Sequence, residues 1–177
     1  DEFRLRFIQA GIMKTPELSV LEASKEIHAY AEFTQHMFEM VRDLLTIKED
    51  DAFEQLFDRI DKYEDRSDDM EVEIAKYLDQ VSDAHLSDDT KEKVRQMLRE
   101  ISEIESIGDS CLHIARTIGR RRAAKEEFTE AQLDNINQMF ELVDDALTQM
   151  GAVLVKHKNE VNVDRSFTME NQINNYR

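Results

Sequence analysis

Apolar side chains recur at helical spacing between residues 53 and 81, and neither proline nor glycine interrupts this stretch. At about 100° per residue, the spacing places these side chains on one stripe of a single long helix. The stripe consists of Phe53, Leu56, Phe57, Ile60, Tyr63, Met70, Ile74, Tyr77, Leu78 and Val81. The 177 residues include only four glycines and one proline, too few for a turn-rich β fold. We therefore predict an all-α fold, an elongated antiparallel bundle of long helices.

Capping residues and the same apolar spacing divide the chain into four helices. We place them at about 15–45, 51–81, 89–125 and from 129 onward. Thr15-Pro16 is a strong start signal, because threonine caps a helix and proline suits its first position. We expect Asp89 to contribute to the cap of the third helix, and Thr129 with Gln132 to form a capping box for the fourth.

Three acids interrupt the apolar stripe of the second helix. By the same rotation, Glu64 and Glu71 project within the stripe, and Asp68 lies at its edge. A buried carboxylate is too costly to leave uncompensated, so it is protonated, paired with a base or bound to a metal. The segment from Glu64 to Glu71 is therefore a candidate ligand-binding segment.

A second acidic pair lies beside the apolar face of the third helix. Glu105 and Asp109 are one turn apart, a spacing at which like charges repel. Gly108 lies between them, and a glycine inside a helix is explained by the close crossing of another helix. If the second and third helices pack together, four oxygen donors face one another and make a hard-cation site. These donors are Glu64, Asp68, Glu105 and Asp109, with Glu71 as a further ligand.

Charge and composition exclude several classes of function. The net charge of −16 argues against nucleic acid as a partner, since its phosphates would be repelled. No apolar run reaches the roughly 18 residues of a membrane span, so we expect no membrane insertion by this segment. The single cysteine, Cys111, is expected in the core. The chain begins at Asp1 without methionine, which suggests a piece of a longer protein or a processed one.

Two stretches of the chain are similar to each other. Residues 139–147, MFELVDDAL, closely match residues 37–45, MFEMVRDLL. The fourth helix therefore resembles the first helix of a second copy. Residues 169–174, with Glu170 and Asn174 one turn apart, stand where the second helix of that copy would begin.

Three stretches resemble known phosphate-regulatory sequences. The run EIESIGD followed by HIAR (within residues 103–116) resembles the acidic signature helix of PhoU-type domains, and KYEDRSDDME (residues 62–71) resembles its companion motif. The opening TPELSVLEASKEI is similar to the segment that follows the membrane part of bacterial sodium/phosphate cotransporters with a PhoU-like tail.

The resemblance implies an organisation and a function. PhoU-type domains are two copies of a three-helix unit, so one domain would comprise a lead-in segment (1–14), a first repeat (15–125) and the start of a second (126–177). The function implied is regulation of sodium-dependent phosphate uptake, without catalysis, from the cytoplasmic side of the inner membrane. The partner would be the membrane domain of the same parent chain. The cofactor implied is iron, or another divalent metal: magnesium, manganese, calcium or zinc.

Three other interpretations stay open from the residues. The chain could be a free-standing cytoplasmic PhoU-type regulator, or a metal-free structural or homo-oligomerising bundle whose acids pair with Arg59, Arg66 or Arg116. An oxygen-activating enzyme is disfavoured, because such bundles use Glu-x-x-His pairs that do not occur on the apolar faces. The basic run Arg120–Arg122 with Lys125 suits a solvated helix end or, less well, an anion-docking patch.

Overall fold

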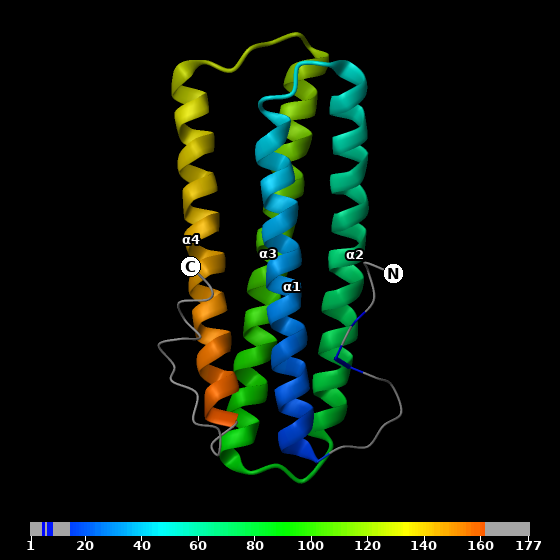
Figure 1. Cartoon of the computed structure of the whole chain (residues 1–177), viewed down its shortest axis with the longest axis vertical. Helices are drawn as coiled ribbons and strands as arrows, with labels where there is room; N and C mark the ends of the chain where they lie inside the picture. The colour runs from blue at the N-terminus through cyan, green and yellow to red at the C-terminus, as the bar shows by residue number, and fades with distance from the viewer. Residues whose placement is uncertain (1–4, 6, 9–14, 162–177) are drawn as a thin grey trace.

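Four long antiparallel helices make up the described part of the protein. The computed structural model describes residues 5, 7, 8 and 15–161, with the backbone alone for 151–161. The helices are α1 (Pro16–Leu44), α2 (Asp50–Ser82), α3 (Asp88–Ala123) and α4 (Glu130–Val161). They run alternately up and down along the long axis of the molecule (Figure 1). The predicted all-α antiparallel bundle is confirmed.

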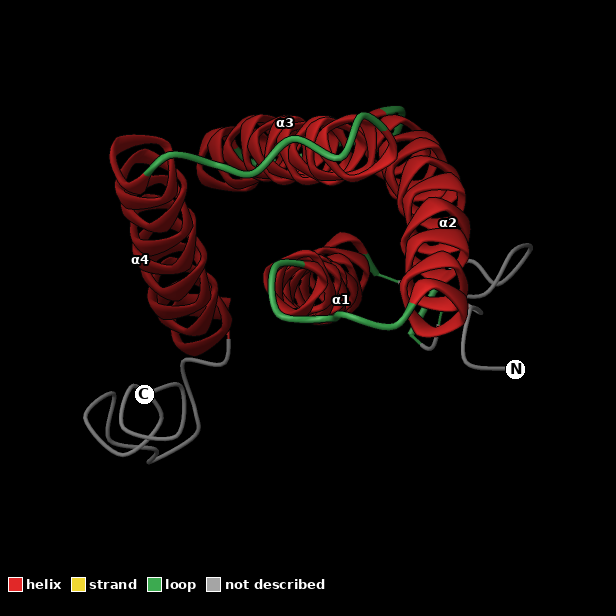
Figure 2. Ribbon diagram, turned by 90° about the horizontal axis from the view of Figure 1, so that it is seen from above, coloured by secondary structure: helices red, strands yellow, loops and turns green. Residues whose placement is uncertain are grey.

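The first helix is the centre of the arrangement. α1 packs against α2, α3 and α4, and the view from above shows the other three helices around it on three sides (Figure 2). α2 also packs against α3, whereas α3 and α4 meet only sparsely. The packing of α2 on α3 brings the two acidic stretches of the sequence onto neighbouring helices.

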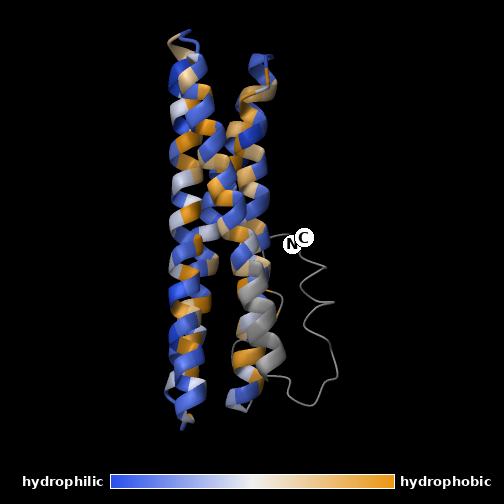
Figure 3. Ribbon diagram, turned by 90° about the vertical axis from the view of Figure 1, so that its left-hand side faces the viewer, coloured by the Kyte–Doolittle hydropathy of each residue, from blue (hydrophilic) through white to orange (hydrophobic). Residues whose placement is uncertain are grey.

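The apolar stripes form the core, as their spacing predicts. Hydrophobic and hydrophilic residues alternate along each helix (Figure 3). On the α2 stripe, Leu56, Phe57 and Tyr77 are half-buried and the other seven residues are buried. On α4, the face turned to the bundle is buried, as Phe140 and Leu147 show, but Met139 is 44% exposed. Met139 therefore faces solvent rather than filling the core.

The helix ends confirm two predicted caps and correct two boundaries. The hydroxyl of Thr15 accepts a hydrogen bond from the Leu18 backbone N–H (3.4 Å), and Thr129 and Gln132 bond reciprocally (3.0 and 3.2 Å). α3 is capped by Ser87 rather than Asp89, because it begins one residue earlier than expected. It also ends at Ala123 rather than Lys125, since Lys125 takes a left-handed backbone conformation with φ of 55°.

Part of the lead-in segment docks on the bundle. Leu5 and Ile8 pack against the core, and the backbone N–H of Phe7 donates to Oε2 of the buried Glu26 at 2.7 Å. The other apolar lead-in positions and the predicted helix start at 169–174 lie outside the described residues. The division into two repeats therefore stays a prediction.

Candidate metal centre

Three of the predicted acids come together between α2 and α3. Each of Glu64, Asp68 and Asp109 offers a carboxylate oxygen, and these oxygens all lie within 4.8 Å of one another. Glu64 and Asp68 are one turn apart on α2, and the packing of α2 on α3 adds Asp109. Glu64 is only 5% exposed, whereas Asp68 and Asp109 are exposed. The cluster is therefore buried on one side and open to solvent on the other.

One oxygen of Glu64 is buried without compensation. Its Oε2 atom is inaccessible to solvent and has no hydrogen-bond partner in the described part of the chain. Burial raises the pKa of Glu64 to about 8, and the neighbouring Asp109, Asp68 and Glu105 carboxyl groups add to this effect. At neutral pH the group therefore needs either a proton or a cation beside it.

The two other predicted ligands lie at the edge of this cluster. Hydrogen bonding with Asp109, followed by burial and further acidic charges, raises the pKa of Glu105 to about 7. The pKa of Asp68 is raised by burial first and by Asp109 next, and the pKa of Glu71 by burial and then by Asp68. Glu105 and Glu71 are half-buried and are not part of the three-residue group.

Among the described residues, neither Arg59 nor Arg116 forms an ion pair with these acids. Arg66 lies 4.0 Å from Asp69, and Arg59 lies over the Tyr63 ring with 5.7 Å to the ring centroid. Arg116 lines a groove between α2 and α3. Each charge that shifts the pKa of Glu64, Asp68, Glu71 or Glu105 belongs to another acid. The arrangement concentrates negative charge and suits a hard divalent cation.

Gly108 makes room for the buried carboxylate. A Cβ atom at this position would lie 3.3 Å from Glu64 Oε2, 3.3 Å from Met37 Cε and 3.5 Å from Ser67 Oγ. The predicted close approach at Gly108 is therefore confirmed, although side chains rather than a helix backbone make it. The glycine allows the Glu64 carboxylate to lie directly against α3.

Sequence reasoning missed two hydroxyl groups beside the cluster. Ser67 Oγ donates to the hydroxyl of Tyr30 at 3.4 Å, and both side chains are buried. Burial raises the pKa of Tyr30, and the charges of Glu71, Glu105 and Asp68 contribute to the rise. A tyrosine in the apolar stripe of α1 was the available signal, because a buried hydroxyl needs a polar partner.

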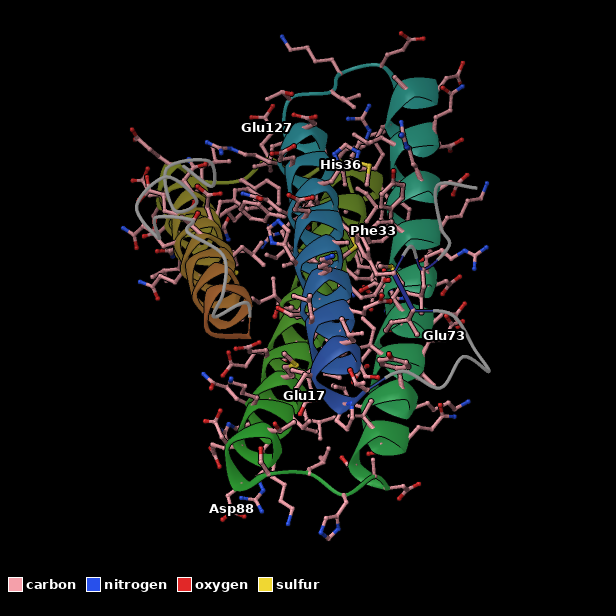
Figure 4. All side chains as sticks on the ribbon, turned by 60° about the horizontal axis from the view of Figure 1, so that its bottom comes forward. Glu17, Phe33, His36, Glu73, Asp88 and Glu127 are labelled. Atoms are coloured by element: carbon pink, nitrogen blue, oxygen red, sulfur yellow. The ribbon has the colours of Figure 1, made fainter. Side chains whose placement is uncertain are left out.

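The surroundings of the cluster are firmly packed. The rings of Phe33 and Tyr63 stack at 4.6 Å between α1 and α2, and Phe33 is visible there in Figure 4. His36, at the rim, has a half-exposed side chain 3.8 Å from Glu39. Cys111 is buried as predicted, and burial, with the charge of Glu64, raises the pKa of its thiol to about 12. Helices therefore hold the acids of the cluster in fixed positions. The Cys111 thiol beside them is buried and unreactive.

The fold and the cluster define an all-α bundle with an acidic cluster between two of its helices. The profile of the PhoU domain matches residues 27–118, which is more than half of the chain and includes both acidic motifs. The chain belongs to the PhoU domain family. Searches of curated proteins and of solved structures gave no match.

Membership in this family confirms the PhoU resemblance and supports a regulatory role linked to phosphate rather than a catalytic one. Within the described residues, no helix combines the length and the apolar character that crossing a membrane requires.

Proposed function

We propose that this PhoU domain binds a divalent metal between α2 and α3 and, in response, modulates a sodium-dependent phosphate transporter. Glu64, Asp68 and Asp109 are the primary ligands, and Glu105 and Glu71 extend the set. The observation that carries the proposal is the buried Oε2 atom of Glu64, which has no hydrogen-bond partner among the described residues and lies beside further carboxyl groups. The resemblance of the opening segment to cotransporter tails supports the transporter context.

The donor set fits the metal class expected from the resemblance. Carboxylate oxygens suit iron, magnesium, manganese and calcium better than thiolate-preferring ions, and the described residues place no thiol or imidazole in the cluster. Iron is our first choice because of the resemblance, and zinc is the softest ion in the set. A bound divalent cation would supply the positive charge that lets neighbouring carboxylates on α2 and α3 stay ionised together.

The residues of the cluster link metal binding to the geometry of the bundle. Glu64 and Asp68 are held by α2, and Asp109 is held by α3, so the spacing of the two helices depends on how closely these carboxylates approach. Both helices pack on α1, which also contacts α4. A change in the α2–α3 spacing is thereby passed to the rest of the bundle and to a membrane domain docked on it, on the cytoplasmic side of the inner membrane.

Metal content tests the binding part of the proposal. The parent protein is dialysed against Fe²⁺, Mn²⁺ or Mg²⁺ and then against metal-free buffer, and bound metal is measured by elemental analysis. The test variant is Glu64→Gln/Asp68→Asn/Asp109→Asn. The matched control removes three acids outside the cluster, with Asp61→Asn, Glu73→Gln and Glu103→Gln. Figure 4 shows Glu73 on the outer side of α2, away from the other helices.

We expect stoichiometric metal in the parent and in the control, and none in the test variant, with all three proteins equally helical by circular dichroism. Metal retained by the test variant, or absent from the parent under every condition, would refute the site. In the second case the metal-free structural bundle becomes the better interpretation. Phosphate uptake by cells that carry the parent protein or the test variant then shows whether the metal site acts on phosphate transport.

A further inference from the structure

Side chains of α1, α2 and α3 meet at one buried point on the inner side of the acidic cluster. At Gly108 of α3, a Cβ atom would lie 3.3 Å from Glu64 Oε2 and 3.5 Å from Ser67 Oγ, both of α2. Ser67 in turn donates to the hydroxyl of Tyr30 on α1 at 3.4 Å. The three helices pack against one another in pairs, and α1 lies inside the angle that α2 and α3 form (Figure 2). One buried carboxylate oxygen and two hydroxyl groups therefore share a small volume.

All three side chains are withdrawn from solvent. Tyr30 and Ser67 are 0% and 1% exposed, and Glu64 is 5% exposed. Burial raises the pKa of Tyr30, so its hydroxyl keeps its proton at every physiological pH. Buried polar groups are costly to leave without hydrogen bonds, and these three have one another as close neighbours.

The two hydroxyl groups carry one more proton than their shared hydrogen bond uses. Ser67 and Tyr30 each have one O–H donor, and each oxygen can also accept. One bond joins them, so one O–H group is left to donate to a third group, and no acceptor among the described residues engages it. Glu64 Oε2 has the opposite requirement, because it is a buried acceptor that no donor among the described residues reaches.

Ser67 can serve both neighbours by a small rearrangement. Glu64 and Ser67 are three residues apart on α2, so they lie side by side on one face of the helix. If Tyr30 donates to Ser67 Oγ, the Ser67 O–H is released to donate to Glu64 Oε2. Rotation of the Ser67 hydroxyl and a shift of the flexible Glu64 side chain are enough for this, and hydrogen bonds connected in a chain strengthen one another.

We propose that Ser67, oriented by Tyr30, competes with the divalent cation for the Glu64 carboxylate. This inference rests on the proposed function and specifies what limits the affinity of that site. In the metal-free protein, Ser67 donates to Glu64 Oε2. When a cation is bound, Glu64 turns to it and Ser67 keeps only its hydrogen bond to Tyr30. Ser67 is therefore a positioning residue that weakens metal binding and keeps it reversible.

The position of Ser67 distinguishes it from the ligands. It precedes Asp68 in the sequence, but Asp68 is exposed whereas Ser67 is buried against Tyr30 of α1. The acids thus approach a cation from the open side of the cluster, and the hydroxyl pair acts on Glu64 from the closed side. Because Tyr30 belongs to the helix that contacts all three others, the exchange also links the cluster to the centre of the bundle.

Removal of single hydroxyl groups tests the competition. Ser67→Ala removes the competing donor, whereas Tyr30→Phe removes its partner and leaves the serine in place. The matched control is Ser24→Ala, which removes the hydroxyl of a serine on α1 that is only 2% exposed and lies outside the cluster. The dissociation constant for Mn²⁺ is measured by isothermal titration calorimetry. Urea unfolding of the metal-free proteins is measured in parallel, and folding is checked by circular dichroism.

We expect Ser67→Ala to bind Mn²⁺ about fivefold more tightly than the parent protein, because one net hydrogen bond is lost from the metal-free state alone. Tyr30→Phe and Ser24→Ala should stay within about twofold of the parent affinity. A purely structural role of Ser67 predicts unchanged or weaker binding instead. In metal-free protein, Ser67→Ala should lower the urea midpoint by about 0.5 M. This loss should shrink when Glu64→Met has already removed the acceptor.

The outcomes separate this inference from the proposed function. A parent protein that binds no Mn²⁺ would refute the metal site, and the competition with it. A parent that binds Mn²⁺, with Ser67→Ala binding it no more tightly, would overturn the competition alone. An equal loss of urea midpoint from Ser67→Ala with and without Glu64→Met would also overturn it, because the hydroxyl would then not compensate the carboxylate.

Discussion

Replacing Gly108 with alanine separates the stability of the bundle from its capacity to bind metal. Alanine is about 1 kcal/mol more favourable than glycine inside a helix. The added Cβ, however, meets Glu64 Oε2 and Met37 Cε at 3.3 Å, so both must move by a few tenths of an ångström. Both atoms are the far ends of flexible side chains, which makes this adjustment inexpensive. We therefore expect Gly108→Ala to change the free energy of unfolding of the metal-free protein by less than about 1 kcal/mol.

The same displacement moves the buried carboxylate that we propose as the principal ligand. We expect the affinity for Mn²⁺, measured by isothermal titration calorimetry, to fall about tenfold in Gly108→Ala, equivalent to about 1.4 kcal/mol. Gly119→Ala is the control, because it makes the same helix-stabilising change on α3 with Phe57 as its nearest neighbour. It should leave Mn²⁺ affinity unchanged.

The reasoning fails if Gly108→Ala binds Mn²⁺ as tightly as the parent protein. It also fails if the loss persists unchanged when Glu64 is already replaced, because the effect is assigned to that carboxylate alone. A double-mutant cycle with Glu64→Gln measures this coupling directly. Urea unfolding of the metal-free variants, run in parallel, shows whether stability and affinity change independently.

Two further predictions concern stability. Burial raises the pKa of Glu100 from 4.5 to about 7, so between these values the folded protein holds a proton that the unfolded chain has released. The contribution of Glu100 to stability is therefore fully present below pH 4.5 and lost as the pH rises through 7. This loss amounts to about 3 kcal/mol, and Glu100→Gln should remove it when urea unfolding at pH 5 and pH 8 is compared. A pH dependence unaltered by that substitution contradicts the assignment. Arg122→Ala removes three hydrogen bonds of 2.7–2.8 Å and a ring contact of 4.4 Å with Phe53, and it should cost about 2 kcal/mol in urea unfolding. The control Arg95→Ala breaks only an exposed pair with Glu92, so its free energy of unfolding should stay within about 0.5 kcal/mol of that of the parent. An equal effect of the two substitutions would refute a structural role of Arg122.

The apolar spacing predicted helix positions well because it depends on local geometry. The four helices begin and end within two residues of the predicted boundaries where these were stated. The errors arose at helix ends, where one hydroxyl or one backbone angle decides the boundary: Ser87 rather than Asp89 caps α3, and the left-handed conformation of Lys125 ends it. The exposure of Met139 shows a further limit, since periodicity identifies an apolar face without showing whether another helix covers all of it.

The candidate metal centre was predictable in its residues but not in its geometry. The rotation angle put Glu64 inside an apolar stripe, and this alone identified it as an acid that needs compensation. The sequence could not distinguish a metal from an arginine partner, since Arg59, Arg66 and Arg116 were all near in sequence. Only the packing of α2 on α3 showed that Asp109 joins Glu64 and Asp68, whereas Glu105 and Glu71 lie at the edge.

The sequence by itself determined which helices form and which of their faces are apolar, because helix periodicity and capping are properties of neighbouring residues. The tertiary structure decided which charges meet, because contacts between helices depend on their relative rotation and height. It placed the hydroxyl of Tyr30 from α1 against the hydroxyl of Ser67 from α2. It also set Glu54 of α2 and Arg116 of α3 along one groove. These contacts join residues far apart in the chain, and no local pattern records them.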